Sequence, residues 1–379
     1  MMTGLRAQVA ISATAFMIVV LTGSSRLNAQ MATAERIQQT RWWPTSPKPA
    51  RSEFVGSSEC ASCHRANVVS QQTTSMAQTA SRAEDAAVLR AHERLTFRFG
   101  SLVYTLARSG RSTMFTNTDG AQTLSAPLAW AFGRGNVGQS YLFERDGKFH
   151  ESRVSYYDAI KGLDFTPNRT LTAPPATIQE AMSRPIEDAE ARRCFGCHTT
   201  ASSTATGFAA SRSIPGVTCE ACHGPGRAHV NAMERGGDRS RAARTIFNPR
   251  TLDANDSVDL CGACHATFWD VQLAGERGIA ALRSQPFRLQ SSRCWTGDRR
   301  LACVACHDPH APLVRDAEFY DSRCLACHQA GSANTSAAPI RTCSVATTRC
   351  VTCHMPKYDV PEMHYAFTDH LIRVPATAR

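Results

Sequence analysis

The chemistry of this chain is concentrated in one pentapeptide, C-x-x-C-H, which occurs seven times and holds 14 of the 16 cysteines and seven of the 13 histidines. On one helical turn, positions i and i+3 share a face and position i+4 lies beside them. Each repeat can therefore present two thiols and one imidazole together. Motifs 1 to 7 are residues 60–64, 194–198, 219–223, 261–265, 303–307, 324–328 and 350–354.

This spacing is the attachment signature of c-type haem, in which two thiols add to the vinyl groups and the imidazole binds the iron. Zinc sites pair two C-x-x-C knuckles and need no following histidine, and iron–sulfur sites use other cysteine spacings. We therefore predict seven covalent haem c groups. The attaching thiols are Cys60, Cys63, Cys194, Cys197, Cys219, Cys222, Cys261, Cys264, Cys303, Cys306, Cys324, Cys327, Cys350 and Cys353. The iron-binding histidines are His64, His198, His223, His265, His307, His328 and His354.

The sixth ligands are fewer than the irons. Complete bis-histidine coordination needs seven more histidines, but only six lie outside the motifs. At least one haem is therefore expected to take Met, water, Lys or a group from another molecule. His310 lies so close to motif 5 that we expect it to bind a neighbouring haem. The candidate sixth ligands are His92, His229, His310, His364, His370 and, for the haem of motif 1, Met76.

Two of these assignments have open alternatives. His92 and His150 border a β-rich segment, and each is as easily a surface or structural histidine as a ligand. Met76 lies in a polar stretch and is equally an exposed side chain. A Met ligand would raise the potential of its haem relative to bis-histidine neighbours, whereas water at that position would leave a reactive haem.

Residues 1–29 have the pattern of a secretory signal, with Arg6, an apolar stretch over 9–21 and Ala29 before the expected cleavage point. An uncleaved anchor is the alternative. No later segment is apolar over the roughly 18 residues of a membrane span. The mature chain is therefore expected in the periplasm or outside the cell, without a transmembrane helix. In such an oxidising compartment, Cys294 and Cys343 are predicted to form a disulfide; two unpaired thiols, or one thiol as a haem ligand, are the alternatives.

The formal net charge of +10 would suit a nucleic-acid partner. Two propionates on each of seven haems would roughly cancel that charge. The chain shows neither a basic stripe nor a nucleic-acid-binding motif, so no nucleic-acid partner is expected.

Motif spacing indicates the architecture. Motif 1 stands apart, whereas motifs 2 to 7 crowd into residues 194–354, too little chain for a separate apolar core around each cofactor. The predicted fold is a mainly α and irregular multihaem cytochrome c fold, with haems forming the core and a small β-rich insertion. The segments are a signal peptide (1–29), an extended linker (30–58), a haem 1 segment (59–94), the β-rich insertion (95–157) and a six-haem domain (158–379).

Three local patterns support this division. Pro185 suits the first turn of a helix that leads into motif 2, with Glu187 and Asp188 near its start. Residues 141–151 predict a hairpin that turns at Asp146 and Gly147, with Phe143 facing His150. The G-x-G-x-x-G match at 133–138 precedes a strand rather than a helix, so it predicts a glycine-rich turn and not a dinucleotide site.

Several longer stretches carry a family resemblance. They are F-V-G at 54–56 before motif 1, C-E-A-C-H-G-P-G at 219–226 with His229, H-D-P-H at 307–310, H-M-P-K at 354–357 and T-D-H at 368–370. In this order they resemble bacterial multihaem (heptahaem) cytochromes c of the doubled-C-x-x-C-H branch. That branch is related in haem packing to the tetrahaem cytochrome, pentahaem nitrite reductase and hydroxylamine oxidoreductase superfamily. The resemblance covers most of residues 54–375. Some relatives carry a histidine shortly after the first motif, where this chain has T-T-S-M at 73–76.

The resemblance implies haem binding more specifically than it implies a reaction. The leading interpretation is an electron-transfer protein whose partners are other cytochromes or a membrane quinol oxidoreductase, with contact to a membrane surface left open. The alternative is an oxidoreductase with one open haem that acts on a small nitrogen or sulfur oxyanion, with its catalytic residues unassigned. A third is an assembly cytochrome that docks on a redox partner through the β segment.

Overall fold

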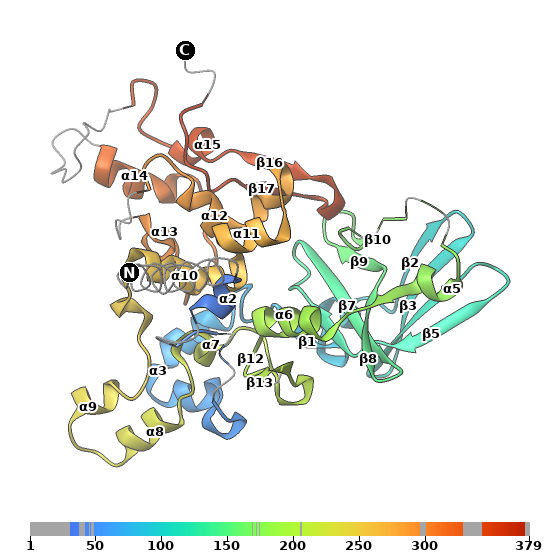
Figure 1. Cartoon of the computed structure of the whole chain (residues 1–379), viewed down its shortest axis with the longest axis horizontal. Helices are drawn as coiled ribbons and strands as arrows, with labels where there is room; N and C mark the ends of the chain where they lie inside the picture. Colours follow the sequence, from blue (N-terminus) through green and yellow to red (C-terminus); the bar gives the residue numbers. More distant parts are fainter. Residues whose placement is uncertain are drawn as a thin grey trace, which may run out of the picture.

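The computed structural model describes residues 31–37, 42–44, 46, 49–168, 170–171, 173, 175–204, 207–295, 301–328 and 343–375. The predicted signal peptide lies outside these residues. A β-sheet region spans residues 80–185, and the residues on both sides of it form a helical region that carries all seven motifs (Figure 1). Among the described residues, no helix is both long and apolar enough to cross a bilayer.

The β-sheet region contains two antiparallel sheets. One has four strands in sequential order: β2 (Arg94–Phe99), β3 (Leu102–Ser109), β4 (Ser112–Thr118) and β5 (Thr123–Pro127). The other has seven, with the order β1 (Ala80–Arg82), β6 (Trp130–Phe132), β7 (Gly138–Arg145), β8 (Lys148–Ser152) and β11 (Ser183–Pro185). Its remaining strands, β9 (Val154–Tyr157) and β10 (Gly162–Phe165), pair with each other, and β9 also pairs with β7.

Side chains from both sheets fill one apolar core. Tyr104 and Phe115 enter it from the four-stranded sheet, and Tyr141 and Phe143 enter it from the seven-stranded sheet, all fully buried. The short helix α5 (Ile178–Met182) closes the core, where the Tyr104 hydroxyl donates to the carbonyl of Ala181 at 2.9 Å. Burial raises the pKa of Tyr104 to about 12, which keeps this phenol neutral.

Two local predictions in this region are confirmed. Strands β7 and β8 form the predicted hairpin, with Phe143 opposite His150 and positive φ angles at Asp146 and Gly147. Positive φ at both central residues is the signature of the tight turn that matches strand twist. The glycine-rich stretch at 133–138 joins β6 to β7 as a turn, and Gly133, with φ 101°, approaches the backbone so closely that a Cβ would lie 2.4 Å from the carbonyl oxygen of Gly138.

The β-sheet region is larger than the small insertion predicted, because its strands run from Ala80 to Pro185. The fold is therefore mixed rather than mainly α. Pro185 ends strand β11 and does not open a helix; the helix that leads into motif 2, α6 (Asp188–His198), begins three residues later. The proline suits this place because it lies at the end of a sheet edge, where no ladder donor is needed.

Residues 31–58 also differ from an extended linker. They include the helix α2 (Thr33–Arg36), whose Arg36 donates to Asp259 at 2.9 Å. Ile37 and Trp43 are buried in a cluster with Leu252 and Leu260. The described part of this segment therefore packs against the helical region.

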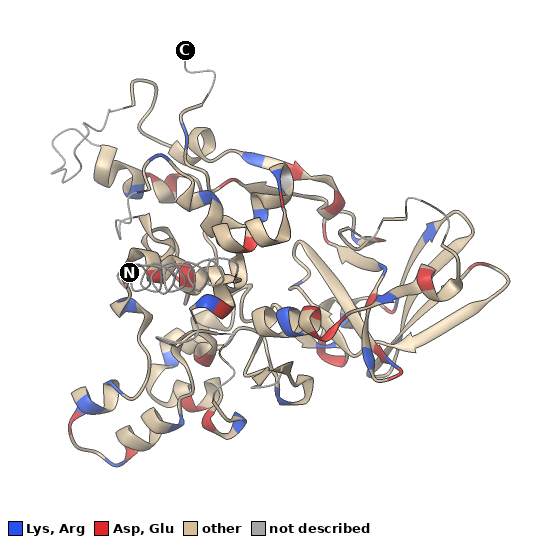
Figure 2. Ribbon diagram, viewed as in Figure 1, with Lys and Arg blue, Asp and Glu red and all other residues tan. Residues whose placement is uncertain are grey.

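The helical region consists of short helices joined by loops. Besides the motif helices, it contains α8 (Arg227–Glu234), α11 (Phe268–Ala274), α12 (Gln285–Gln290) and a C-terminal ribbon of β16 (Lys357–Val360) and β17 (Tyr365–Thr368). Its apolar clusters are small, such as Val258, Leu289 and Ala302. Basic and acidic residues are interspersed along both regions (Figure 2).

Candidate haem-binding site

Each motif lies on a helical turn. Three of the helices end on the motif histidine after a leading segment: α6 at His198, α10 (Ala254–His265) and α14 (Asp321–His328). Helices α7 (Cys219–His223), α13 (Cys303–Cys306) and α15 (Cys350–His354) consist of little more than the motif. In α3 (Ser57–Gln71), the helix is kinked at His64, with φ −114° and ψ 36°. The two cysteines of every motif are thus one helical turn apart, as the attachment of one haem requires.

The fold brings the motif helices together in pairs. Contacts join α3 to α7, α6 to α10, α10 to α13, and α14 to α15. In each pair, a thiol of one motif lies beside a thiol of the other. The thiol pairs are Cys60–Cys219, Cys197–Cys264, Cys261–Cys303 and Cys324–Cys350.

Weaker interactions connect the pairs to one another. Cys222 of motif 3 lies near both thiols of motif 4, and Cys306 of motif 5 lies near Cys324 of motif 6. The motifs therefore follow the spatial order 1–3–4–5–6–7, with motif 2 beside motif 4. Motif 1, distant from the others in sequence, is thus next to motif 3 in space.

Several histidines are oriented as metal ligands usually are. A carbonyl oxygen can only accept, so an imidazole whose Nδ1 faces a carbonyl carries its proton there and keeps the Nε2 lone pair for a metal. Two motif histidines show this arrangement, with the acceptors Phe247 for His223 (3.0 Å) and Arg373 for His354 (2.7 Å). Nδ1 of His198 lies 2.7 Å from the Thr79 hydroxyl and 3.3 Å from the Thr79 carbonyl. The same arrangement occurs outside the motifs, from His229 to Ala242 (3.0 Å), from His370 to Thr368 (3.1 Å) and from His92 to Val88 (2.9 Å).

Burial favours the neutral imidazole at two of these positions. It lowers the pKa of His198 to about 4 and that of His370 to about 4. Neutral imidazole is the form that binds a metal, so the two side chains are ready to act as ligands at neutral pH.

Two motif histidines each lie close to a histidine from outside the motifs. The ring centres of His223 and His310 are 6.0 Å apart with an angle of 11° between the ring planes, and those of His307 and His370 are 6.2 Å apart with an angle of 44°. Metal–imidazole bonds of about 2 Å on each side, with each ring centre about 1 Å beyond its nitrogen, place two axial rings about 6 Å apart. Both separations would suit two imidazoles that bind one haem, and His310 lies beside the histidine of motif 3.

The remaining histidines outside the motifs lie on or against the β-sheet region. His92 bonds the carbonyl of Val88 at 2.9 Å, and His150 packs on Phe143. His364 directs Nε2 to the Asp164 carboxylate at 2.9 Å. Met76 lies apart from these histidines; its carbonyl accepts from the Val217 amide at 2.9 Å.

The predicted Cys294–Cys343 disulfide is not formed. Both residues are described and both are free thiols. Cys294 is half-buried near Cys324 and Cys327 of motif 6, whereas Cys343 is exposed. A disulfide needs Cα atoms within about 7 Å. The presence of two cysteines outside the motifs does not show that they are this close in space.

The groups that orient the histidines could not be predicted from the sequence. The acceptors of Phe247 and Arg373 are backbone carbonyls, which any residue type supplies. One orienting side chain could have been suspected from the sequence, because Asp369 directly precedes the candidate ligand His370. In the structure, Asp369 is a fully buried carboxylate paired with Arg288. A charged residue next to a candidate ligand is a signal for such an orienting group.

Comparison with known proteins gives two matches. Residues 150–224, less than half of the chain, match the family model for cytochrome c554 and c-prime; this stretch includes motifs 2 and 3. No curated protein matches the chain. A solved structure, the outer cell wall cytochrome OcwA, aligns with a TM-score of 0.48 and 14% sequence identity, covering 85% of this chain and 80% of that one.

Proposed function

We propose that this multihaem c-type cytochrome carries seven covalent haems and transfers electrons between redox partners outside the cytoplasm. The observation that carries the proposal is the arrangement of the attachment sites: helix contacts join motifs 1 and 3, 2 and 4, 4 and 5, and 6 and 7, and nearby thiols relate motif 3 to motif 4 and motif 5 to motif 6. Haem c supplies one-electron exchange when it is bound. Attachment sites that touch one another hold such groups close enough for electrons to pass between them.

The residues of the chain attach, orient and shield the haems. The cysteine thiols of each motif form the covalent links, and the motif histidine provides one axial ligand. We assign His310 as the second axial ligand opposite His223, and His370 as the second axial ligand opposite His307, from the ring separations of 6.0 and 6.2 Å. His229, whose Nδ1 is held by Ala242, is a third ligand of this kind.

The haem of motif 1 retains Met76 as its proposed ligand. His229 is a second candidate ligand for this haem, because it lies on α8, which packs against η1 (Arg51–Glu53) just before α3. A redox titration of the holoprotein distinguishes Met76 from His229, because a thioether ligand gives its haem a higher potential than a second imidazole does.

The number of histidines leaves some haems without a second imidazole. Of the six histidines outside the motifs, His92, His150 and His364 lie on or against the β-sheet region. We assign only the other three as axial ligands, so several irons would need a different sixth ligand or an exchangeable one. On this assignment, the deficit would be larger than the composition alone indicates.

Haem counting tests the main proposal. Mass spectrometry of the mature chain, produced with the c-type maturation system, should show seven added haems, and five or fewer would contradict the proposal. Replacing Cys194 and Cys197 with serine should remove one haem. Because α6 contacts α10, the same change should also disturb the haem of motif 4.

The shortage of second imidazoles supports an alternative function. A haem with an exchangeable site would make the chain an oxidoreductase that acts on a small nitrogen or sulfur oxyanion. Carbon monoxide added to the reduced protein and electron paramagnetic resonance of the oxidised protein test this function. Carbon monoxide binding with a high-spin ferric signal would favour the enzyme, whereas seven low-spin haems that bind no carbon monoxide would favour electron transfer alone.

We also make proposals about the export of the chain and about its redox partners. We propose that residues 1–29 direct the chain to the periplasm or the cell surface, where other cytochromes or a membrane quinol oxidoreductase exchange electrons with it. Fractionation of cells that express the full chain should place the haem-containing protein outside the cytoplasm. Stopped-flow mixing with candidate donors would then measure which partner reduces it.

A further inference from the structure

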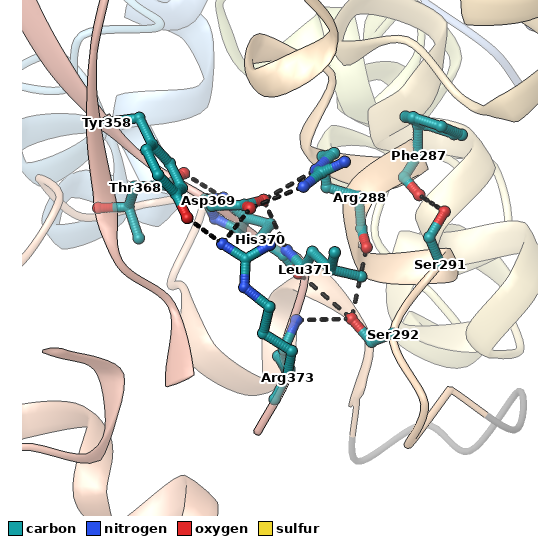
Figure 3. A network of polar contacts seen from close by, with 11 residues as sticks. Phe287, Arg288, Ser291, Ser292, Tyr358, Thr368, Asp369, His370, Leu371 and Arg373 are labelled. Carbon is teal, nitrogen blue, oxygen red and sulfur yellow. Dashed lines mark hydrogen bonds and ion pairs between the residues drawn. The ribbon is translucent and has the colours of Figure 1, made fainter. Parts of the chain in front are cut away.

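Residues 368–373 form a short segment at the end of strand β17, and their centre is the fully buried carboxylate of Asp369. Arg288, on helix α12, donates to both carboxylate oxygens, from Nε to Oδ1 at 2.8 Å and from Nη2 to Oδ2 at 2.7 Å. Arg373 lies 3.3 Å from Oδ2, and the amide of Leu371 donates to Oδ1 at 2.9 Å. One side chain thus collects two cations and a backbone amide (Figure 3).

Backbone bonds continue the attachment on both sides of Asp369. Its own amide donates to the carbonyl of Pro356 at 2.9 Å, next to motif 7. Farther along, the amide of Ile372 donates to the Ser292 hydroxyl at 2.9 Å, just beyond α12. The segment is therefore fastened to α12 on one side and to the chain after motif 7 on the other.

This segment meets two different motifs. The ring of His370 lies near that of His307 in motif 5, at 6.2 Å between ring centres. Three residues later, the carbonyl of Arg373 accepts from Nδ1 of His354 in motif 7 at 2.7 Å. The same few residues thus supply the imidazole of His370 near motif 5 and the Arg373 carbonyl that accepts from the histidine of motif 7.

We propose that Asp369 is a positioning residue that holds the axial ligands of the haems of motifs 5 and 7 at the same time. The proposal rests on the proposed function for the assignment of His370 as an axial ligand. A buried carboxylate with two guanidinium partners is costly to disturb, because loss of its charge leaves two part-buried cations without their shared counter-ion. The segment would then relax at both of its contacts with the motifs.

The two haems should respond in different ways. Loss of the His370 position weakens the second axial bond of the motif 5 haem, which favours the high-spin state. At motif 7, a weaker bond from His354 Nδ1 to the Arg373 carbonyl makes the imidazole a poorer electron donor, because such outer bonds raise ligand basicity. A poorer donor stabilises ferric iron less, so the potential of that haem should rise.

The test uses the full holoprotein with Asp369→Asn. Mass spectrometry first counts the haems; electron paramagnetic resonance and a redox titration then follow each one. We expect seven haems, one of them converted from low spin to high spin, one other with a raised potential, and five unchanged. Seven unchanged haems, or a change at only one, would overturn the proposal.

Three further variants make the result specific. Arg288→Lys keeps the charge but loses the paired contact, so it should move the same two haems by less; this variant decides the question if Asp369→Asn loses a haem. His370→Ala should change the motif 5 haem alone, which identifies its signal. Glu151→Gln removes the carboxylate from another part-buried arginine pair, with Arg184 at 3.0 Å, and should leave both haems unchanged.

These variants separate the two proposals. If His370→Ala changes no haem, the axial assignment fails, whatever Asp369→Asn does. If His370→Ala changes one haem and neither Asp369→Asn nor Arg288→Lys changes two, the assignment holds and the positioning role is wrong.

Discussion

The β-sheet region and the helical region differ in what fills their interiors. The β-sheet region has a continuous core of aromatic and aliphatic side chains from two sheets and α5. The helical region, in its described part, has only small apolar clusters. Around motifs 5 to 7, it also exposes large apolar side chains, which are Val304, Leu313, Val314, Phe319 and Tyr358.

This difference separates two ways of stabilising a fold. Burial of side chains supplies about 25 cal/mol per Å² of apolar surface removed from water, and the β-sheet region can use it without a cofactor. In the helical region, we expect covalently attached haem to cover some of the exposed apolar side chains. The first region should fold from its sequence alone, and the second should need its cofactors.

The largest effect should come from withholding haem. We expect a chain of residues 30–379, made without the c-type maturation system, to keep the β-sheet region folded and to lose protection throughout the motif helices. Hydrogen exchange followed by mass spectrometry would map the protected amides, and limited proteolysis should leave a fragment near residues 80–185. Equal protection of both regions would show that the helical region has a sufficient core of its own.

A large effect confined to one region should come from the β core. Phe143 is fully buried between the sheets, and Phe143→Ala should cost about 3–5 kcal/mol of stability. Hydrogen exchange of β7 and β8 in the holoprotein would measure this loss, while the haem spectra stay unchanged. Ile160→Ala, at a residue 46% exposed in the same region, should cost less than about 0.5 kcal/mol.

A smaller effect should come from a substitution in the packing between the two regions. Phe195 lies between the two cysteines of motif 2 and packs edge-on against Trp130 and Phe132, with ring centres 5.0 and 5.3 Å away. Phe195→Leu keeps most of the volume but loses the aromatic geometry, so it should cost about 0.5–1.5 kcal/mol. Because Phe132 also contacts His198, a redox titration should show a shift of one haem, that of motif 2. A shift of several haems, or of none, would contradict this boundary role.

Local patterns in the sequence predicted the local structure well. The motif turn depends on five consecutive residues, and all seven copies lie on helical turns. The β7–β8 hairpin depends on its two turn residues and on strand alternation, so even the pairing of Phe143 with His150 could be predicted. In both cases, the interactions that decide the structure occur between near neighbours in the chain.

Long-range contacts explain what the sequence did not predict. Strand β11 pairs with β8, and this contact extends the β-sheet region to Pro185. The nearby sequence alone, with Pro185 before Glu187 and Asp188, favoured the start of a helix there. The partner of His310 depends on how α7 and the loop after α13 meet. The position of Cys294 beside motif 6 depends likewise on tertiary packing, so counting cysteines could not reveal it.

The smallest effect should come from the hydrogen bond between His364 and Asp164, which joins the two regions. His364, just before β17, donates from Nε2 to Asp164 of β10 at 2.9 Å, and its ring lies against Tyr157 at 4.9 Å between ring centres. The side chains are 26% and 36% exposed, so solvent screens the pair, and Asp164→Asn should cost no more than about 1 kcal/mol. His364→Asn should behave in the same way and leave every haem spectrum unchanged, because its Nε2 is already committed to a carboxylate. Electron paramagnetic resonance of this variant, compared with His370→Ala, tests the division directly. Loss of a low-spin signal in His364→Asn would make His364 an axial ligand held by the β-sheet region, and that region would then help to build a haem site rather than only pack beside one.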